Sequence, residues 1–447
     1  MVQKIGDPFV SIKVFYNNNQ ERTINHLSSI YDNEGLICES VKELLEGRLN
    51  IYDIKGKRIL LKPNWVKHCD GEFDPICLCT NNSVTLALVK YLLEYKPSSI
   101  IIGDAPIQGC DWDKLMDIKF ETVINELSTK YKTPIIIKDF RKVTFDPSSN
   151  KLVENRNSED NYLIFDVGNK SYLEEITSPE NTFRVTCYNP DRLALSHHKG
   201  VHKYCIIKDV FECDTIITIP KIKTHQKSGI TNSLKILVGI NGDKDYLPHH
   251  RIGAEGHGGD CYKGWHPLRR MSELVLDAAN RRRGKKIYTI LNYLSAGLWR
   301  LSMPNPAQNL AAGWYGNDTV WRMVLDLNLV AIFGKSDGSL SETPQRTLYT
   351  LCDGIIGGQG NGPLSPEPLP LGVLAFSNDP YAMDEAAGIL FNMNISRIPL
   401  LREATSLNKD KTIEYYVNNE KTTREALYKY STDVIMPPGW VDYNKES

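Results

Sequence analysis

Short apolar runs alternate with predicted helices through the first third of the chain, and this alternation constrains the fold most. The runs, which are typical of β-strands, lie at residues 9–16, 58–61, 100–102 and 135–137. Helices are predicted between them, at residues 36–49, 83–95 (with Ser83 as N-cap) and 112–131. Strands that alternate with helices of this length form βαβ units, so the sequence predicts a parallel sheet.

The same pattern divides the chain into six segments. A polar excursion with one expected strand at residues 162–167 separates a first α/β region from a second, and a mainly helical insertion follows. The segments are an N-terminal α/β lobe (1–140), the polar excursion (141–180), a second α/β region (181–266), the helical insertion (267–331), the completion of the second lobe (332–410) and a peripheral tail (411–447). We therefore expect an α/β protein of two α/β lobes with mainly parallel sheets, a helical insertion and a ligand cleft between the lobes.

Composition and charge argue against several classes of protein. A formal net charge of -1 disfavours a dedicated nucleic-acid binder. The most apolar helical segment, residues 287–303, is interrupted by Asn292 and Arg300, so we expect a buried core helix there and no transmembrane span. The N-terminus lacks the apolar core of a signal peptide. The 10 cysteines have no disulfide or ferredoxin-type pattern, which predicts a reducing compartment and no iron–sulfur cluster. The expected protein is cytoplasmic, without a nucleic-acid or membrane partner, and self-association is left open.

Residues 218–262 carry the densest set of reactive side chains. An apolar run at residues 215–219 predicts a strand that stops at Pro220, a basic loop follows, and residues 230–240 place apolar side chains at helical spacing. Ligands of α/β sheets bind beyond the carboxyl ends of such strands. Most histidines of the chain lie in or near this stretch, where they could bind a metal or an anion, transfer protons, or cluster without function. They are His197, His198, His202, His225, His249, His250, His257 and His266.

Polar residues also follow the second and third predicted strands. Lys62 and Asn64 flank a proline that ends the second strand, and both side chains suit a phosphate or carboxylate; an ordinary strand-end turn is the alternative. Asp104 and Gln108 follow the third strand, in a loop without a G-x-G-x-x-G fingerprint. Asp104 could be a base, a metal ligand or an N-cap, whereas the nearby Cys110 is interpreted as a buried spectator thiol.

Two further motifs could bind ligands. His198 and His202 would share one face of a helical turn, an arrangement that suits a metal. Gly357, Gly358 and Gly360 belong to a glycine-dense loop expected after a strand, where backbone N–H groups could approach an anion; a flexible lid is the alternative.

Two charged features have a structural interpretation. Asp379 and Asp384 stand at the start of a helix expected from about residue 381, where carboxylates favour the helix N-terminus. The basic run at residues 281–286 is interpreted as a solvated helix end, which interacts favourably with the helix dipole, and not as a nucleic-acid contact.

Motifs spread in order over nearly the whole chain resemble the uncharacterised family catalogued as domain of unknown function 362. They read KPNWV from Lys62, GDAPIQGCD, IPKIKTH followed by GITNSLKILVGI, NDTVWRMVLDLN from Asn317, DGIIGGQGNGP and NDPYAMDEAA. By these motifs the chain is identified as a member of that family, and the resemblance implies no assigned activity.

The segment from His225 to Gly239 is also similar to the part of lactate racemase-type proteins that holds a nickel-pincer nucleotide. In those proteins a histidine and a lysine ten residues apart contact the cofactor, the lysine joins it covalently, and a later histidine binds nickel. Here Lys235 lies ten residues after His225, and His249 and His250 follow 14 and 15 residues after Lys235. This second resemblance implies a shared fold and a shared cleft.

The catalytic histidine that lactate racemase-type proteins carry after the third strand is missing here, because Asp104 and Gln108 occupy that loop. The cofactor therefore stays open, with a divalent metal as one option. The leading hypothesis is a cytosolic enzyme that acts on a small carboxylated or phosphorylated anion, with isomerase-, epimerase- or transferase-like chemistry. The rival is a non-catalytic protein that binds a small molecule, or serves assembly, through the same cleft.

The expected site draws on all of these segments. Its catalytic residues are His225 as acid or base, Lys235 and Asp104. Its anion-binding residues are Lys62, Asn64, Gln108, Lys223, Thr231, Asn232, Gly357, Gly358 and Gly360. Its metal ligands are His225, His249 and His250, with His198 and His202 as a second set.

Overall fold

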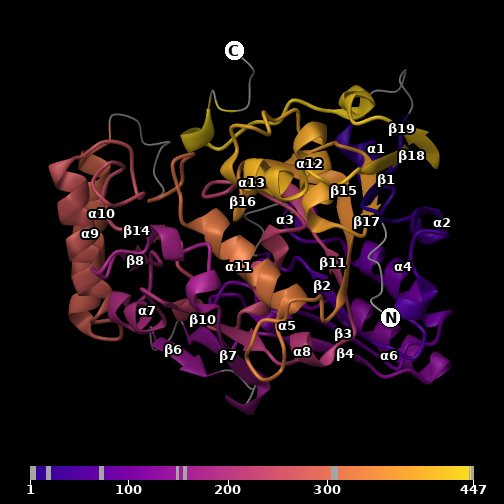
Figure 1. Cartoon of the computed structure of the whole chain (residues 1–447), viewed down its shortest axis with the longest axis horizontal. Coiled ribbons are helices and arrows are strands. Elements are labelled where there is room, and N and C mark those ends of the chain that lie inside the picture. Colours follow the sequence, from indigo (N-terminus) through magenta and orange to yellow (C-terminus); the bar gives the residue numbers. More distant parts are fainter. Residues whose placement is uncertain are drawn as a thin grey trace.

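The computed structural model describes residues 7–16, 22–69, 75–146, 151–154, 159–303, 311–441 and 443. In this part of the chain the main element is a 12-stranded sheet whose strands run in the order β19-β18-β1-β17-β15-β11-β2-β3-β4, with β12 and β16 also paired to β15 and β13 paired to β12 (Figure 1). The strands on the main path are β1 (Phe9–Val14), β2 (Arg58–Pro63), β3 (Ser99–Asp104), β4 (Ile135–Asp139), β11 (Thr215–Ile219), β15 (Thr347–Asn361), β17 (Val373–Ser377), β18 (Glu414–Val417) and β19 (Glu420–Thr422).

The centre of this sheet is parallel and covered on both faces. Strands β15, β11, β2, β3 and β4 run in one direction, and β17 runs antiparallel between β15 and β1. Successive side chains of a strand point to opposite faces. Ile59 and Leu61 pack into a core with one set of helices, and Leu60 packs into a second core with the other set. The first set is α2 (Glu34–Leu45), α4 (Asn82–Leu93) and α6 (Ile118–Tyr131); the second is α11 (Val320–Phe333), α12 (Pro380–Leu390) and α13 (Pro399–Leu407).

The α/β class and the mainly parallel sheet are therefore confirmed, whereas two separate lobes with a cleft between them are not. Strands from the two regions share one sheet, because β17, β15 and β11 of residues 181–410 lie between β1 and β2 of residues 1–140. The tail also joins this sheet, since β18 pairs with β1. The polar excursion supplies the expected strand as β7 (Tyr162–Asp166), which pairs with β10 (Val201–Ile207).

Local capping explains two differences in the first third. The helix expected at residues 83–95 begins at Asn82, because the side chain of Asn81, and not Ser83, accepts the backbone N–H of Ser83. The helix expected at residues 112–131 is broken into α5 (Trp112–Leu115) and α6, because Asp117 caps a new helix by accepting the backbone N–H of Lys119. The other short elements are α1 (Ile24–Ser28), α3 (Pro75–Leu78), α7 (Pro190–Ser196), α8 (Asp209–Glu212), β5 (Val143–Asp146), β6 (Lys151–Glu154), β8 (Phe183–Arg184), β9 (His197–His198) and β14 (His250–Arg251).

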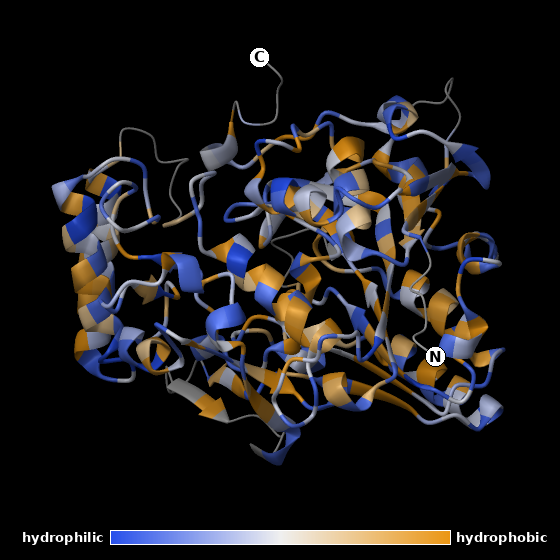
Figure 2. Cartoon of the chain, viewed as in Figure 1, coloured by the Kyte–Doolittle hydropathy of each residue, from blue (hydrophilic) through white to orange (hydrophobic). Residues whose placement is uncertain are grey.

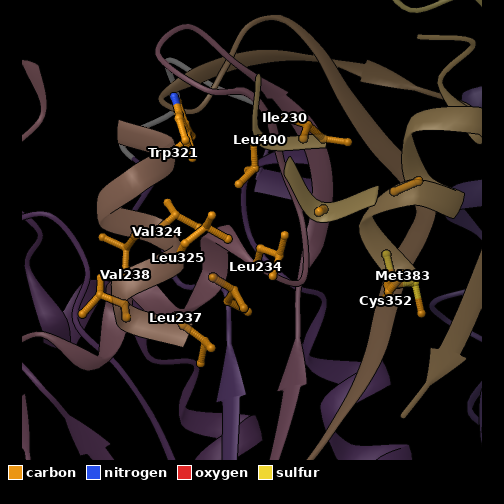
Figure 3. Close-up of a cluster of buried hydrophobic side chains, with 14 of the residues drawn as sticks. Ile230, Leu234, Leu237, Val238, Trp321, Val324, Leu325, Cys352, Met383 and Leu400 are labelled. Atoms are coloured by element: carbon orange, nitrogen blue, oxygen red, sulfur yellow. The ribbon is translucent and has the colours of Figure 1, made fainter. Parts of the chain in front are cut away.

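The prediction of a helix at residues 230–240 after a basic loop is wrong. The basic loop is the strand β12 (Lys221–His225), which forms a hairpin with β13 (Gly229–Thr231), and a 3₁₀ helix, η5 (Lys235–Ile240), follows. The glycine-dense loop is also a strand, because it forms the end of β15 and pairs with β12 and with β16 (Ser365–Leu369). Figure 3 shows what holds η5: Leu234, Leu237 and Val238 pack beside Val324 and Leu325 of α11.

The helical insertion contains two long antiparallel helices, α9 (Pro267–Asn280) and α10 (Lys286–Leu301), which lie side by side at one edge of the molecule (Figure 1). The prediction of a buried core helix near residues 287–303 is wrong, because several apolar side chains of α10 are exposed, including Ile290 at 63% and Tyr293 at 74%. No helix within the described residues is long and apolar enough to cross a membrane.

Candidate anion site

The carboxyl ends of β2 and β3 carry a buried ion pair. Lys62 Nζ donates to Asp104 Oδ1 at 2.5 Å, and the backbone N–H of Trp65 donates to Asp104 Oδ2 at 2.7 Å. Burial lowers the pKa of Lys62, and Asp104 opposes that shift; burial likewise raises the pKa of Asp104, and Lys62 opposes it. Asp104 is therefore the partner of Lys62 and of a backbone amide, which disfavours its predicted role as a free catalytic base.

Gly239 closes over this ion pair. A Cβ at this position would overlap Asp104 Oδ1 and would lie 2.7 Å from Lys62 Nζ. Its carbonyl also accepts the backbone N–H of Ala105 at 3.0 Å. The glycine thus brings η5 against the ends of β2 and β3.

Strand β12 of the β12–β13 hairpin carries two buried lysines with different partners. Lys221 Nζ lies 2.6 Å from Asp353 Oδ2, both side chains are inaccessible to solvent, and the pair is a structural ion pair. Lys223 Nζ donates to the carbonyl of Leu78 at 2.5 Å, and burial lowers its pKa to about 8. Thr231 faces Lys223 across the hairpin, and its buried hydroxyl has no hydrogen-bond partner within the described residues.

His225 ends β12 and has a defined tautomer. Its Nδ1 accepts the backbone N–H groups of Lys227 at 3.0 Å and Ser228 at 3.2 Å, so the neutral ring carries its proton on Nε2. Burial holds its pKa well below the usual value, and Lys235, His249, Lys227 and Lys223 lower it further. His225 is therefore neutral near pH 7 and presents an N–H donor at Nε2.

Lys235 belongs to a group of four amines, of which Lys223 and Lys227 are buried and Lys235 and Lys244 half-buried. Burial lowers its pKa to about 7, and the nearby Lys244, Lys223 and Lys227 contribute further lowering. Lys244 is affected in the same way, because burial lowers its pKa to about 8 while Asp104 opposes the shift. Among the residues that the structure describes, none of these four lysines has a carboxylate within ion-pair distance. We call Lys223, Lys227, Lys235 and Lys244 the lysine cluster.

His249 and His250 lie beside the lysine cluster. Burial, followed by Lys227, holds the pKa of each well below the usual value. His249 Nδ1 donates to the carbonyl of Leu247 at 2.6 Å. The buried Nδ1 of His250 has no hydrogen-bond partner in the described part of the chain.

The predicted metal sites are not assembled. Within the described residues no three His, Cys, Asp or Glu side chains come together in a group that could hold a metal ion. The lysines around His225, His249 and His250 repel a divalent cation and attract an anion. His198 and His202 do not share a helical turn, because they lie on opposite strands of the β9–β10 hairpin. His198 is exposed, and His202 Nε2 lies 3.0 Å from Glu174 Oε2.

The remaining predicted anion ligands have structural contacts. Gln108 Oε1 accepts the hydroxyl of Tyr188 at 2.5 Å, and Asn232 Oδ1 accepts the thiol of Cys352 at 3.1 Å. The backbone N–H of Asn64 donates to Thr80 Oγ1 at 2.9 Å, and its side-chain Nδ2 is buried without a partner among the described residues. Cys110 is buried with its pKa raised to about 12 by burial, in agreement with a spectator thiol.

The three predicted glycines serve packing. Gly357, Gly358 and Gly360 pair with β16 through their backbones, so they form no anion-binding loop. A Cβ at Gly358 would lie 2.8 Å from the Cβ of Lys223, and the glycine therefore allows β12 to approach β15.

The two acidic residues before α12 have different roles. Asp379 caps the helix as predicted, since its Oδ1 accepts the backbone N–H groups of Tyr381 at 2.9 Å and Ala382 at 3.0 Å. Asp384 is fully buried, and both its oxygens lie 3.4 Å from the backbone N–H of Leu234. Burial raises its pKa to about 8. Asp384 thus supports the residue that precedes Lys235.

A cavity of about 290 Å³ adjoins the lysine cluster, between the α9–α10 hairpin and the body of the protein. Thr186 joins the two regions, because it lines the cavity and its Oγ1 accepts a hydrogen bond from Lys227 Nζ at 3.1 Å. His250 also lines the cavity. The cavity therefore lies between the helical insertion and Lys227 of the cluster.

Sequence reasoning brought together His225, Lys235, Lys223 and the histidines at 249 and 250, and it missed Lys244. Lys244 begins the 3₁₀ helix η6 (Lys244–Tyr246), between two aspartates that give the segment the pattern of an ordinary polar loop. Electrostatic coupling between Lys244 and Lys235 appears only in the folded chain.

Comparison with known proteins adds a family. A search among curated proteins finds no match to the chain. A family model described as "Domain of unknown function (DUF362)" matches residues 165–388, which include the whole lysine cluster and its histidines. These residues make up half of the 447-residue chain. The chain therefore belongs to the DUF362 family.

Proposed function

We propose that this protein is a cytosolic enzyme that acts on a small carboxylated or phosphorylated substrate, whose anionic group binds at the lysine cluster. One observation carries the proposal: four amines, of which Lys223 and Lys227 are buried and Lys235 and Lys244 half-buried, gather where the described residues offer none of them a carboxylate within ion-pair distance. An ammonium group that is removed from water without an opposite charge nearby costs free energy, and a bound anion would offset that cost. The donor at His225 Nε2 and the hydroxyl of Thr231 suit the same ligand.

The adjoining cavity supports a small organic substrate. Its volume of about 290 Å³ lies at the lower end of the range for small-molecule sites. Thr186 and His250 would place the uncharged part of the substrate next to the amines that hold its anionic group.

Proton transfer is the chemistry that the amines favour. A pKa of about 7 leaves Lys235 partly neutral at neutral pH, which suits a general base. While the other three amines hold the anionic group, the fraction of Lys235 that is neutral would accept a proton from the carbon next to the carboxylate, or next to a carbonyl of a phosphorylated substrate. His225 would donate a hydrogen bond from Nε2 to the oxygen that gains negative charge. This assignment favours isomerase- or epimerase-like reactions over group transfer, and it makes His225 a donor and not a base.

Two remaining points of the proposal rest on different observations. None of the ten cysteines, all of which lie within the described residues, forms a disulfide, which supports the reducing environment of the cytosol. A covalent adduct on Lys235, as the similarity to lactate racemase-type proteins implies, requires a neutral amine, and the lowered pKa of Lys235 supplies one. Intact-protein mass spectrometry of freshly purified protein tests for such an adduct.

The experiment for the main proposal is proton exchange in heavy water. Purified protein is incubated in D₂O with a panel of small carboxylic and phosphorylated acids, and proton NMR follows the loss of carbon-bound protons. We expect exchange for one class of acid, and its loss in Lys235→Met. Lys55→Met is the matched control, because Lys55 is an exposed lysine in another part of the chain.

The outcomes separate enzyme from binder. Binding of an acid without exchange, measured by calorimetry and abolished by Lys235→Met, would favour the non-catalytic alternative. Binding and exchange that are equal in Lys235→Met and wild type would refute both versions.

A further inference from the structure

The α9–α10 hairpin has a polarity opposite to that of an ordinary surface hairpin. The side of α9 that faces the body is polar, with Ser272, Glu273, Asp277 and Asn280 buried there. Asp277 pairs with Arg184 of β8, with Asp277 Oδ2 2.9 Å from Arg184 Nη2. Surface helices normally turn their apolar side to the core. On the inner side the hairpin contributes few apolar side chains, among them Leu276 and Trp299 at the cavity, and many others lie elsewhere.

Those apolar residues face solvent. On α10 the exposed positions follow helical spacing of three, four and seven residues, which places them along one stripe. They are Ile287, Ile290, Leu294 and Leu301, joined by Tyr293 on α10, by Met271 and Leu274 on α9, and by Trp265 before α9. Leu301 is 77% exposed. Figure 2 shows hydrophobic colour along this hairpin, at the edge of the molecule.

The hairpin is also strongly basic. Residues 265–303 contain eight arginines and lysines and only two acidic residues, in a chain whose formal net charge is -1. The two acidic residues, Glu273 and Asp277, are buried, so the outer surface carries positive charge. Arg282, Lys285 and Lys286 lie exposed at the turn between the helices, and within the described residues they form no ion pair.

We propose that the outer face of the α9–α10 hairpin binds the surface of an anionic lipid bilayer. Exposed aliphatic and aromatic side chains on one face, together with basic residues, characterise helices that lie in the plane of a membrane interface. The 16 residues of α10 would span only about 24 Å, too short for the hydrocarbon core, so the helix lies on the membrane and does not cross it. This contact differs from the sequence-based expectation of no membrane partner.

Charge decides between a membrane and a second copy of the chain. Self-association through the same face would bring two basic hairpins together, each with eight arginines and lysines against two buried acidic residues, and repulsion between them opposes such a dimer. Anionic lipid headgroups instead neutralise Arg282, Lys285 and Lys286 while the apolar side chains leave water.

Vesicle sedimentation tests the inference with the full chain. We expect sedimentation with vesicles of three parts phosphatidylcholine to one part phosphatidylglycerol at low salt, and little with phosphatidylcholine alone. The double variant Ile290→Gln/Leu294→Gln should reduce the bound-to-free ratio at least about tenfold, because two apolar side chains no longer leave water. Lys285→Gln/Lys286→Gln should reduce it by about the same factor. Ile118→Gln is the control, since Ile118 is 79% exposed on α6.

Three results would overturn the inference. The first is no sedimentation with anionic vesicles, the second is equal sedimentation with neutral and anionic vesicles, and the third is equal vesicle binding by the Ile290/Leu294 variant and the wild type. A dimer in light scattering that the same variant dissociates, without vesicle binding, would assign the face to self-association. Circular dichroism confirms that each variant is folded. Ile290 and Leu294 do not line the cavity, so failure here leaves the proposed function untouched.

Discussion

Anion affinity should fall as the pH rises, because the lysine cluster must be protonated to bind. Sulfate is a suitable probe, since it keeps its charge throughout the neutral range. The pKa of Lys235 in the free protein is about 7, and a bound dianion raises it by favouring the charged amine. Between the free and bound pKa values binding takes up a proton, and affinity drops tenfold per pH unit for each such lysine.

The size of the effect follows from the pKa values. From about pH 6.5 to about pH 8.5, Lys235 alone lowers sulfate affinity by about 25-fold if its pKa in the complex lies above that range. Lys223, with a pKa of about 8 in the free protein, adds a factor of about four by the same relation. Isothermal titration calorimetry at several pH values measures the slope.

Whereas sulfate affinity falls as the pH rises, the stability of the sulfate-free protein should increase with pH, which gives a second measurement. The pKa of Lys235 is lower in the folded chain than in the unfolded chain, so the unfolded state binds more protons between these values. The contribution of Lys235 therefore destabilises the free protein fully below about pH 7 and fades as the pH rises towards about 10. Lys235→Met should stabilise the sulfate-free protein at pH 6.5 by roughly 2 kcal/mol, which is less than the full shift implies because the side chain is partly exposed.

Substitution by arginine isolates Lys235. Arginine stays charged at every pH used here, so Lys235→Arg should lose the roughly 25-fold share of the pH dependence derived for Lys235. Lys55→Arg should behave like wild type. A pH-independent sulfate affinity in wild type, or an unchanged slope in Lys235→Arg, would refute the reasoning.

Three further predictions concern stability and turnover. His225→Gln should lower turnover by roughly 10²–10³-fold and the free energy of unfolding by only about 1 kcal/mol; unchanged turnover per folded molecule would make His225 architectural. Gly239→Ala should cost roughly 3 kcal/mol in denaturant unfolding, because its Cβ overlaps Asp104, and a neutral result would contradict the close approach. Lys62→Met should cost roughly 3–5 kcal/mol by leaving Asp104 unpaired, and the double variant Lys62→Met/Asp104→Leu should regain most of it; no recovery would argue against a dominant Lys62–Asp104 pair.

The parallel core could be predicted from the sequence because its strands are short apolar runs. Residues 215–219 and 58–61 are buried on both faces, so nearly every residue is apolar and the pattern is clear. The β12 strand could not be found in the same way. One face of β12 carries Lys221, Lys223 and His225. Alternating polar and charged residues in a sequence resemble a solvated loop, although here β15 and Asp353 bury them.

The candidate site could be predicted only in part, because some of its residues come together only through tertiary packing. His225 and Lys235 stand in the segment where strand-end loops were expected, but Lys244 reaches them through tertiary packing. The metal prediction could not be weighed from the sequence, because histidine density does not reveal which charges surround the rings. Lysines lie around the three histidines in the folded chain, and positive charge at that position favours an anion over a cation.

The order of strands in the sheet has a consequence for synthesis of the chain, because β1 pairs, within the described residues, only with strands that are made much later. Strand β11 needs β15, which begins at residue 347, and β1 needs β17 and β18, which follow residue 372. On the ribosome, β2, β3 and β4 can pair early, but β1 leaves the exit tunnel hundreds of residues before its neighbours. At about 5–20 residues per second, its apolar edge stays unpaired for tens of seconds. The N-terminal strand is therefore the part of the nascent chain most in need of protection from aggregation.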